Sequence, residues 1–216
     1  MLKIDSVTLS FSGKEILSGC YLQCQKGEIV GLLGRNGSGK SCLLKIIFGA
    51  LRADFKHLRI DDKLIDKGYE TGEIAYLPQD NFLPPFLKIS SLIQSIDDKV
   101  QNRLSEMDII RENWDKNISQ LSGGTSRIIE TIWILNQKAP YILLDEPFSG
   151  LAPFQVELLQ GLIREAAKEK AIILTDHIYQ PLLEISDRVV LLHNNSVYPI
   201  NTEDDLIQYN YIPDFS

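Results

Sequence analysis

Short apolar runs and amphipathic stretches alternate along the chain, which is the order expected of a sheet whose strands are joined by helices. Residues 28–33 form an apolar run directly before Gly34, and a helix is predicted over residues 40–49. Three later apolar runs predict buried strands at residues 141–144, 171–175 and 188–192. This alternation predicts an α/β core with a mainly parallel sheet.

A second pattern predicts a small antiparallel layer beside this core. Residues 2–30 and about 55–76 alternate in short strand-like segments. Turn residues separate these segments at Ser12-Gly13, Lys26-Gly27 and Asp61-Asp62.

Residues 80–120 show a third pattern, which predicts a helical insertion. Apolar residues recur there at helical spacing, at Ile89, Leu92, Ile93 and Ile96. Near the end of the chain, Thr202 and Asp205 have the spacing of a capping box and predict a short terminal helix. We therefore expect one domain over residues 1–216, with residues 80–120 as a helical subdomain inserted within it.

Composition excludes several classes of function. The chain has 216 residues, 44% of them hydrophobic, and a formal net charge of −7 without a basic cluster, so no nucleic-acid partner is expected. Its apolar runs are too short to span a bilayer and its first residues lack the pattern of a secretory signal, so we expect a cytoplasmic protein. Cys20, Cys24 and Cys42 cannot all pair, and we expect them to be reduced and buried.

The strongest chemical signal is the segment Gly34-Arg35-Asn36-Gly37-Ser38-Gly39-Lys40-Ser41, followed by Cys42 at the start of the predicted helix. It fits the template G-x-x-x-x-G-K-[ST], which predicts a P-loop NTPase core that binds a nucleoside triphosphate. The glycines let backbone N–H groups converge on an anion. Lys40 would reach the β and γ phosphates, and Ser41 would place its hydroxyl on Mg²⁺.

Acidic and polar residues follow two of the other predicted strands. Asp145 and Glu146 come after residues 141–144, and Asp176 and His177 come after residues 171–175. Ligands of open α/β sheets bind beyond the carboxyl ends of the strands, so these residues are expected to meet the phosphate loop. Asp145 would hold Mg²⁺ through water, and Glu146 would orient or deprotonate the water that attacks the γ phosphate.

Leu121-Ser122-Gly123-Gly124 resembles the signature motif of ATP-binding cassette (ABC) ATPases. Because the other motifs stand in the family's order, the resemblance extends from about residue 3 to residue 206. It implies that Ser122, Gly123 and Gly124 contact the γ phosphate of a nucleotide held by a second ABC subunit, either an identical copy or a paralogue.

The same resemblance implies roles for three further residues. Phe11 stands where the family carries an aromatic that stacks on adenine, although a core phenylalanine is the alternative. Gln79 resembles the glutamine that contacts Mg²⁺ and the attacking water. The alternative interpretation is that Gln79 is an exposed glutamine in a loop. His177 resembles the histidine that binds the γ phosphate.

The chain departs from the family pattern at two motifs. Thr125 replaces the Gln or Glu that usually follows the signature, and we expect hydrolysis to survive this change. Ala152 replaces an Asp, which removes a carboxylate expected to make contacts across subunits and puts coupling between the two sites in doubt.

The resemblance implies an ATPase that powers transport through separate integral membrane subunits from the inner face of the cell membrane. Phe82 and Phe86 would contact those subunits, or would pack within the helical subdomain. A cytosolic ABC ATPase that acts on an assembly or repair complex is the alternative. A nucleotide-binding module without hydrolysis is least favoured, because Glu146 and His177 are both present.

Overall fold

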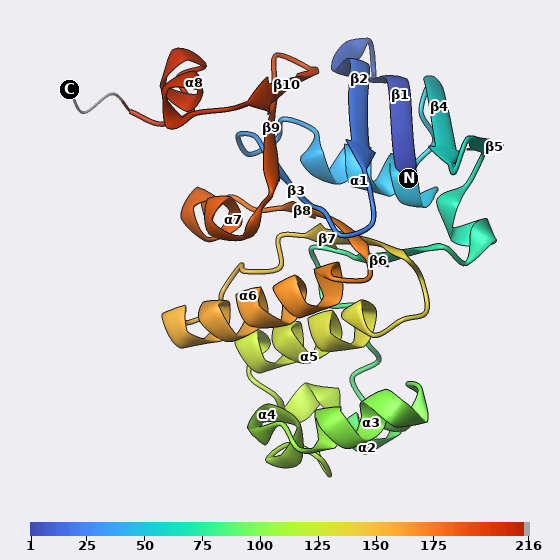
Figure 1. The fold of residues 1–216 in the computed structure, drawn as a ribbon, viewed down its shortest axis with the longest axis vertical. Coiled ribbons are helices and arrows are strands. Elements are labelled where there is room, and N and C mark those ends of the chain that lie inside the picture. Colours follow the sequence, from blue (N-terminus) through green and yellow to red (C-terminus); the bar gives the residue numbers. More distant parts are fainter. Residues whose placement is uncertain (214–216) are drawn as a thin grey trace.

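The computed structural model describes residues 1–213, with the side chain of Lys99 excepted. The predicted end of the domain at residue 216 therefore lies outside the described residues. Within them, a six-stranded sheet has the strand order β10-β9-β3-β8-β7-β6 (Figure 1). Its strands are β3 (Ile29–Leu33), β6 (Ile74–Leu77), β7 (Tyr141–Asp145), β8 (Ala171–Thr175), β9 (Arg188–His193) and β10 (Ser196–Ile200). All pair in parallel except β10, which is antiparallel to β9.

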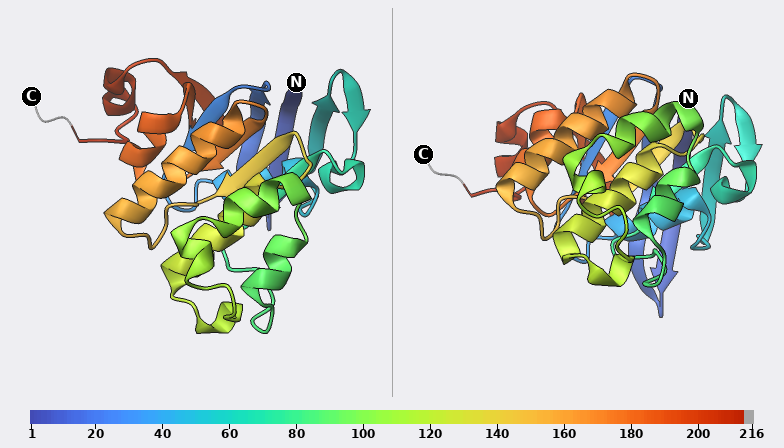
Figure 2. Two further views of the ribbon diagram at one scale, coloured as in Figure 1. Left: turned by 60° about the horizontal axis from the view of Figure 1, so that its bottom comes forward. Right: turned by 90° about the horizontal axis from the view of Figure 1, so that it is seen from below.

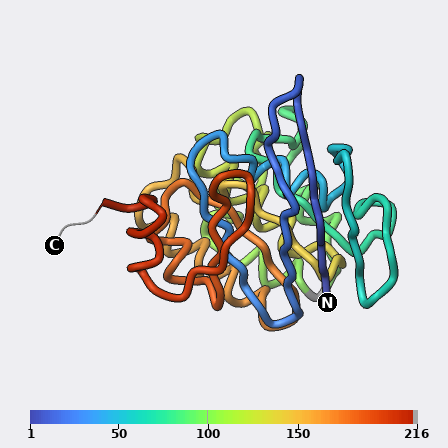
Figure 3. Tube along the Cα trace, turned by 90° about the horizontal axis from the view of Figure 1, so that it is seen from above, coloured from blue at the N-terminus to red at the C-terminus, as the bar shows by residue number. Residues whose placement is uncertain are grey.

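A four-stranded antiparallel sheet packs beside the first one. Its order is β2-β1-β4-β5, with strands β1 (Leu2–Phe11), β2 (Lys14–Cys24), β4 (Phe55–Ile60) and β5 (Lys63–Ile65). Two of the predicted turns close its hairpins, since Ser12-Gly13 joins β1 to β2 and Asp61-Asp62 joins β4 to β5. All four residues have positive φ, which two-residue hairpin turns favour. The third predicted turn, Lys26-Gly27, instead lies between β2 and β3, which belong to different sheets. Figure 3 shows the β1–β2 hairpin projecting beyond the rest of the chain.

One strand lies in a different sheet from the one predicted. The sequence pattern places residues 55–76 in the antiparallel layer, but β6 (Ile74–Leu77) pairs in parallel with β7, with Ile74 opposite Tyr141. A four-residue apolar run has no periodicity that would identify its partner, and this pairing joins segments far apart in the chain. The pairing of β6 with β7 matters for function, because it places Gln79 just after β6, beside the end of β7.

Helices cover both faces of the six-stranded sheet. They are α1 (Lys40–Phe48), α5 (Gly123–Leu135), α6 (Pro153–Ala167), α7 (Tyr179–Ile185) and α8 (Glu203–Gln208). The segment between β6 and α5 contains α2 (Ile89–Gln94), α3 (Asp98–Ser105) and α4 (Asp108–Arg111), and short 3₁₀ helices occur at Gly68–Thr71 and Ile118–Gln120. Figure 2 shows α2–α4 against α5, on the side away from the antiparallel sheet.

Three apolar clusters hold these layers together. The first joins the antiparallel sheet, α1 and one face of the six-stranded sheet. The second joins the opposite face to α5, α6 and α7. The third joins α2–α4 to the face of α5 that turns away from the sheet. Helix α5 therefore packs against both the sheet and the helical segment.

Polar contacts also hold the start of β9 against the start of β3. The Asp187 carboxylate accepts the Ile29 N–H at 2.8 Å, and Arg188 Nε donates to Glu28 at 2.9 Å. These contacts tie β9 to β3.

Among the described residues, no helix is both long enough and apolar enough to cross a bilayer.

The three cysteines are unpaired thiols, as predicted, but they differ in exposure. Cys20 and Cys24 are buried, and Cys42 is half-buried against the first apolar cluster. Burial raises the pKa of Cys20 to about 11 and that of Cys24 to about 12. Burial also raises the pKa of Cys42. At neutral pH all three are expected to be thiols rather than thiolates.

We expect iodoacetamide at pH 8 to modify Cys42 slowly in the folded protein and to leave Cys20 and Cys24 unmodified. The thiolate is the reactive species, and the two buried thiols neither ionise at this pH nor contact solvent. Mass spectrometry of peptides would locate the label, and denaturation in guanidinium chloride should expose all three. Rapid modification of Cys20 in the folded protein would contradict this expectation.

Candidate active site

The loop between β3 and α1 has the geometry of an anion site. Gly37 and Gly39 have φ values of 77° and 107°, a backbone conformation that L side chains rarely adopt. Gly39 also has little space, because a Cβ there would lie 3.0 Å from an Ile16 methyl carbon. Helix α1 begins at Lys40, so its first N–H groups and the positive end of its dipole face the loop. The loop and helix together favour a bound phosphate.

Lys40 lies inside this loop and is only 5% exposed. Its Nζ donates to the carbonyl oxygens of Gly34 at 2.7 Å and Arg35 at 3.4 Å. Burial lowers the pKa of Lys40, and the nearby carboxylates Glu146, Asp145 and Asp176 oppose that lowering. Among the described residues, the hydrogen-bond partners of this ammonium group are neutral carbonyls. A phosphate would offer it a charged partner.

Asp145, at the end of β7, is fully buried and has three hydrogen-bond donors. Its Oδ1 accepts from Ser41 Oγ at 3.0 Å and from Thr175 Oγ1 at 2.8 Å. Its Oδ2 accepts from the Tyr76 hydroxyl at 2.9 Å. Ser41 and Asp145, two of the three residues expected to hold Mg²⁺, are thus neighbours, and hard oxygen ligands of this kind suit that ion.

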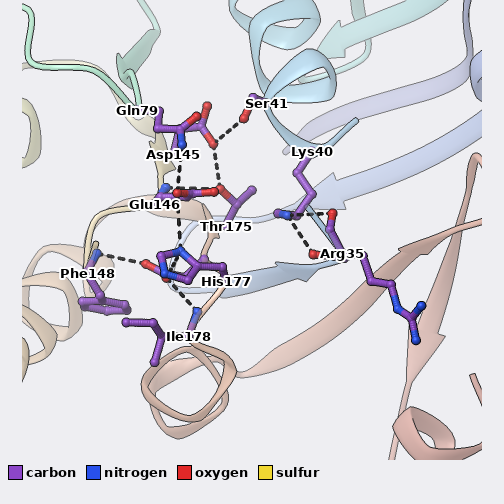
Figure 4. Close-up of polar contacts among 12 residues, drawn as sticks. Arg35, Lys40, Ser41, Gln79, Asp145, Glu146, Phe148, Thr175, His177 and Ile178 are labelled. Carbon is purple, nitrogen blue, oxygen red and sulfur yellow. Dashed lines mark hydrogen bonds and ion pairs between the residues drawn. The ribbon is translucent and has the colours of Figure 1, made fainter. Parts of the chain in front are cut away.

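Glu146, the next residue, has a left-handed backbone with φ 52°, which turns the chain sharply after β7. Gln79 Nε2 donates to its Oε2 at 3.0 Å, and His177 Nδ1 lies 3.5 Å from the same oxygen. Figure 4 shows Gln79, Glu146 and His177 grouped beside Asp145. The three residues come from the ends of three different strands, β6, β7 and β8.

Asp176 supports the position of His177. Its buried carboxylate accepts the N–H groups of Phe148 at 3.0 Å and Ile178 at 2.9 Å, and lies 3.4 Å from His177 Nδ1. Burial raises the pKa of Asp176, and the two N–H groups oppose that rise. The carboxylate thereby fixes the loop after β8 relative to the loop after β7.

One cavity of about 570 Å³ unites the phosphate loop with these polar groups. It is lined by Phe11, Ile16, Asn36, Gly37, Ser38, Gly39, Lys40, Ser41, Cys42, Gln79, Glu146 and His177. Phe11 lies at the tip of the β1–β2 hairpin and is 48% exposed, so it is not the core phenylalanine of the alternative interpretation. Its ring is available at the edge of the cavity.

Three candidate residues, Gly34, Arg35 and Asp145, do not line this cavity. Gly34 and Asp145 are buried behind it, where they accept hydrogen bonds from Lys40 and Ser41. The Arg35 side chain instead turns away from the site, as Figure 4 shows. It donates to the backbone carbonyl of Asn210. Arg35 therefore contributes backbone to the loop rather than a side chain to the cavity.

The signature residues also lie outside the cavity. Ser122 and Gly123 are exposed and Gly124 is half-buried at the start of α5, where Ser122 Oγ accepts the Thr125 N–H at 3.2 Å. These positions suit a ligand that arrives from outside the chain.

Several polar groups of the site were not predicted from the sequence. Tyr76 and Thr175 support Asp145, and the buried pair Arg127 and Glu130 lies on the inner face of α5. Charged residues three positions apart on an otherwise apolar helix face were a usable signal. Their partners are backbone groups 18 to 49 residues away, which the sequence does not reveal.

A family model described as ABC transporter matches residues 17–149. The chain belongs to the ABC transporter family. A probable ABC transporter ATP-binding protein of Azorhizobium caulinodans is 30% identical over 203 residues, which cover 87% of this chain and 72% of that protein. The predicted resemblance is therefore confirmed.

Solved structures share the fold of this ABC cassette. An ATP-binding subunit of an ABC transporter matches with a TM-score of 0.83 at 22% identity, over 99% of this chain and 95% of its own. The dimeric bacterial cassette MJ0796 matches with a TM-score of 0.78 at 20% identity, over 94% of this chain and 100% of its own. The predicted α/β class with a mainly parallel sheet and an added antiparallel layer is confirmed.

Proposed function

We propose that this ABC cassette binds ATP with Mg²⁺ and hydrolyses it to ADP and phosphate. The observation that carries the proposal is the cavity in which the phosphate loop faces Glu146, Gln79 and His177. A binding module needs the loop alone. Glu146 beside the loop, with two polar neighbours on its carboxylate, supports hydrolysis.

Each residue of the site would have a distinct role in binding Mg²⁺-ATP. Lys40 and the N–H groups of the loop would hold the phosphates, and Phe11 would stack on the base. Ser41 would hold Mg²⁺ directly, with Asp145 and Gln79 beside it, and the bound ion would neutralise charge on the β and γ phosphates.

Glu146 would take a proton from water as the water oxygen bonds to the γ phosphorus. The bond from that phosphorus to the bridging oxygen would break, and ADP would leave with that oxygen. His177 and Gln79 would orient the water and the γ phosphate, because both side chains contact the Glu146 carboxylate already.

A second cassette would complete the site. Ser122, Gly123 and Gly124 lie at a helix N-terminus outside their own cavity, so they are available to the γ phosphate of a partner's ATP. The dimeric cassette named above supports this arrangement. The partner would be an identical copy or a paralogue, and Ala152 would contribute no carboxylate to the contact.

The cassette would work at the inner face of the cell membrane, bound to integral membrane subunits that carry the substrate. Phe86 is 78% exposed in the loop between β6 and α2. Phe82, in the same loop, is 36% exposed, and its ring packs against that of Trp133 on α5 with the centroids 5.8 Å apart. Large exposed aromatic side chains near the site are suited to an interface. This loop begins at Gln79, so contact there would reach the catalytic residues.

Purification of the tagged chain from its native cells in mild detergent tests whether the cassette binds integral membrane subunits. We expect a polytopic membrane protein to be recovered in stoichiometric amount, and Phe86→Ala to reduce that recovery. Phe55→Ala is the matched control, because Phe55 is 50% exposed but lies on the antiparallel sheet. Recovery from the soluble fraction with a cytosolic complex would favour the alternative function, in assembly or repair.

A further inference from the structure

Helix α5 carries a buried ion pair that faces the site. Arg127 is 4% exposed and Glu130 is fully buried, and Arg127 Nη1 lies 3.8 Å from Glu130 Oε2. Removing two charges from water is costly unless specific contacts compensate. The contacts of Arg127 and Glu130 therefore indicate what keeps the two charges in this buried position.

Arg127 holds the backbone at the ends of two strands. Its Nη1 donates to the Pro78 carbonyl at 2.6 Å, and its Nη2 donates to the carbonyls of Asp145 and Glu146, the latter at 3.1 Å. Gln79 directly follows Pro78. One rigid, planar guanidinium thus sets the separation of the backbone segments from which Gln79 and Glu146 project.

Glu130 holds the next part of the same loop. Its Oε1 accepts the N–H of Phe82 at 3.0 Å and that of Leu83 at 3.3 Å. Residues 78–83 are therefore bonded to α5 on both sides of Gln79. Both charged residues lie within the first eight residues of α5, whose N-terminus is Ser122–Gly124.

Arg127 and Glu130 do not use all of their hydrogen-bonding capacity in this arrangement. Arg127 Nε and Glu130 Oε2 are buried without a hydrogen-bond partner among the described residues. Inert packing would be served as well by apolar side chains of similar volume. Spare bonding capacity at this point permits the pair to change its contacts when α5 moves.

We propose that Arg127 and Glu130 are positioning residues that transmit movement of the signature end of α5 to Gln79 and Glu146. This inference rests on the proposed ATP hydrolysis. A partner's nucleotide that engages Ser122–Gly124 shifts α5, and the bonds of the pair carry that shift to both loops. Displacements of about 1 Å at reacting groups alter rates by about 10²-fold. Arg127 and Glu130 affect the rate of ATP hydrolysis rather than the binding of ATP, since neither side chain lines the cavity.

The test is ATP turnover and Mg²⁺-ATP affinity of the full chain, with any co-purifying membrane partner retained. Arg127→Lys keeps the charge but loses the two-nitrogen geometry. We expect kcat to fall about 10²-fold while the Kd for ATP stays within about threefold. The matched control is Arg111→Lys, which alters an exposed ion pair with Asp108 on α4 and should leave both quantities unchanged.

A double variant separates positioning from general damage. If Arg127 acts through Glu146, adding Arg127→Lys to Glu146→Gln should leave the single-turnover rate within about threefold of Glu146→Gln alone. A merely structural role would multiply the two losses. That outcome would overturn the inference.

The paired variant Arg127→Met with Glu130→Leu removes both charges together, so neither is left buried without its partner, although the backbone groups that they bond lose theirs. We expect it to fold, to bind ATP and to lose as much kcat as Arg127→Lys. Wild-type kcat in either variant would refute the positioning role while leaving the proposed function intact. Absence of turnover in the wild-type chain would instead refute the proposed function, and the inference with it.

Discussion

Glu146→Gln is expected to bind Mg²⁺-ATP with wild-type affinity and to lose ATP turnover by about 10²- to 10⁴-fold. The amide has the shape of the carboxylate but does not accept a proton from water at neutral pH. The loss corresponds to about 3–5 kcal/mol of barrier. Gln79 Nε2 would retain an oxygen acceptor at position 146, so the arrangement around the site should persist.

The measurement is phosphate release under saturating ATP, together with ATP affinity by calorimetry. Because binding persists while hydrolysis stops, the variant should also accumulate as an ATP-bound dimer on gel filtration. Glu203→Gln makes the same chemical change at an exposed position on α8 and should behave like the wild type. Turnover of Glu146→Gln at the wild-type rate would remove Glu146 from its proposed role.

The phosphate loop could be predicted from sequence because its geometry is local. Gly37 and Gly39 need positive φ, and Lys40 and Ser41 follow at fixed spacing within one turn of helix. The convergence of Asp145, Glu146 and His177 was also predictable, since parallel strands end at the same edge of a sheet. These expectations needed only strand identity and order along the chain.

Contacts between distant backbone segments could not be predicted in this way. The place of β6 depends on its pairing with β7, and a four-residue apolar run does not encode that choice. The hydrogen bonds of Arg127 and Glu130 go to backbone groups, so no complementary side chain in the sequence marks those targets. Such contacts emerge only once the strands and α5 are placed in space.

Lys40→Met is expected to weaken ATP binding and to reduce turnover to background. The ammonium group is buried in the phosphate loop, where its charge would act on the β and γ phosphates at low dielectric. Removing a group that stabilises charge in such a site costs about 10²- to 10³-fold in rate. Methionine has a similar length, and it leaves only the Gly34 and Arg35 carbonyls without their donor.

Calorimetric titration with Mg²⁺-ATP and phosphate release measure the two effects separately. Lys45→Met is the matched control, because Lys45 lies further along α1 and is exposed. Glu146→Gln and Lys40→Met should therefore differ in kind: the first keeps ATP bound without hydrolysis, whereas the second loses affinity as well. If Lys40→Met bound ATP as tightly as the wild type, the phosphates would not lie against Lys40, and the assignment of this loop would be wrong.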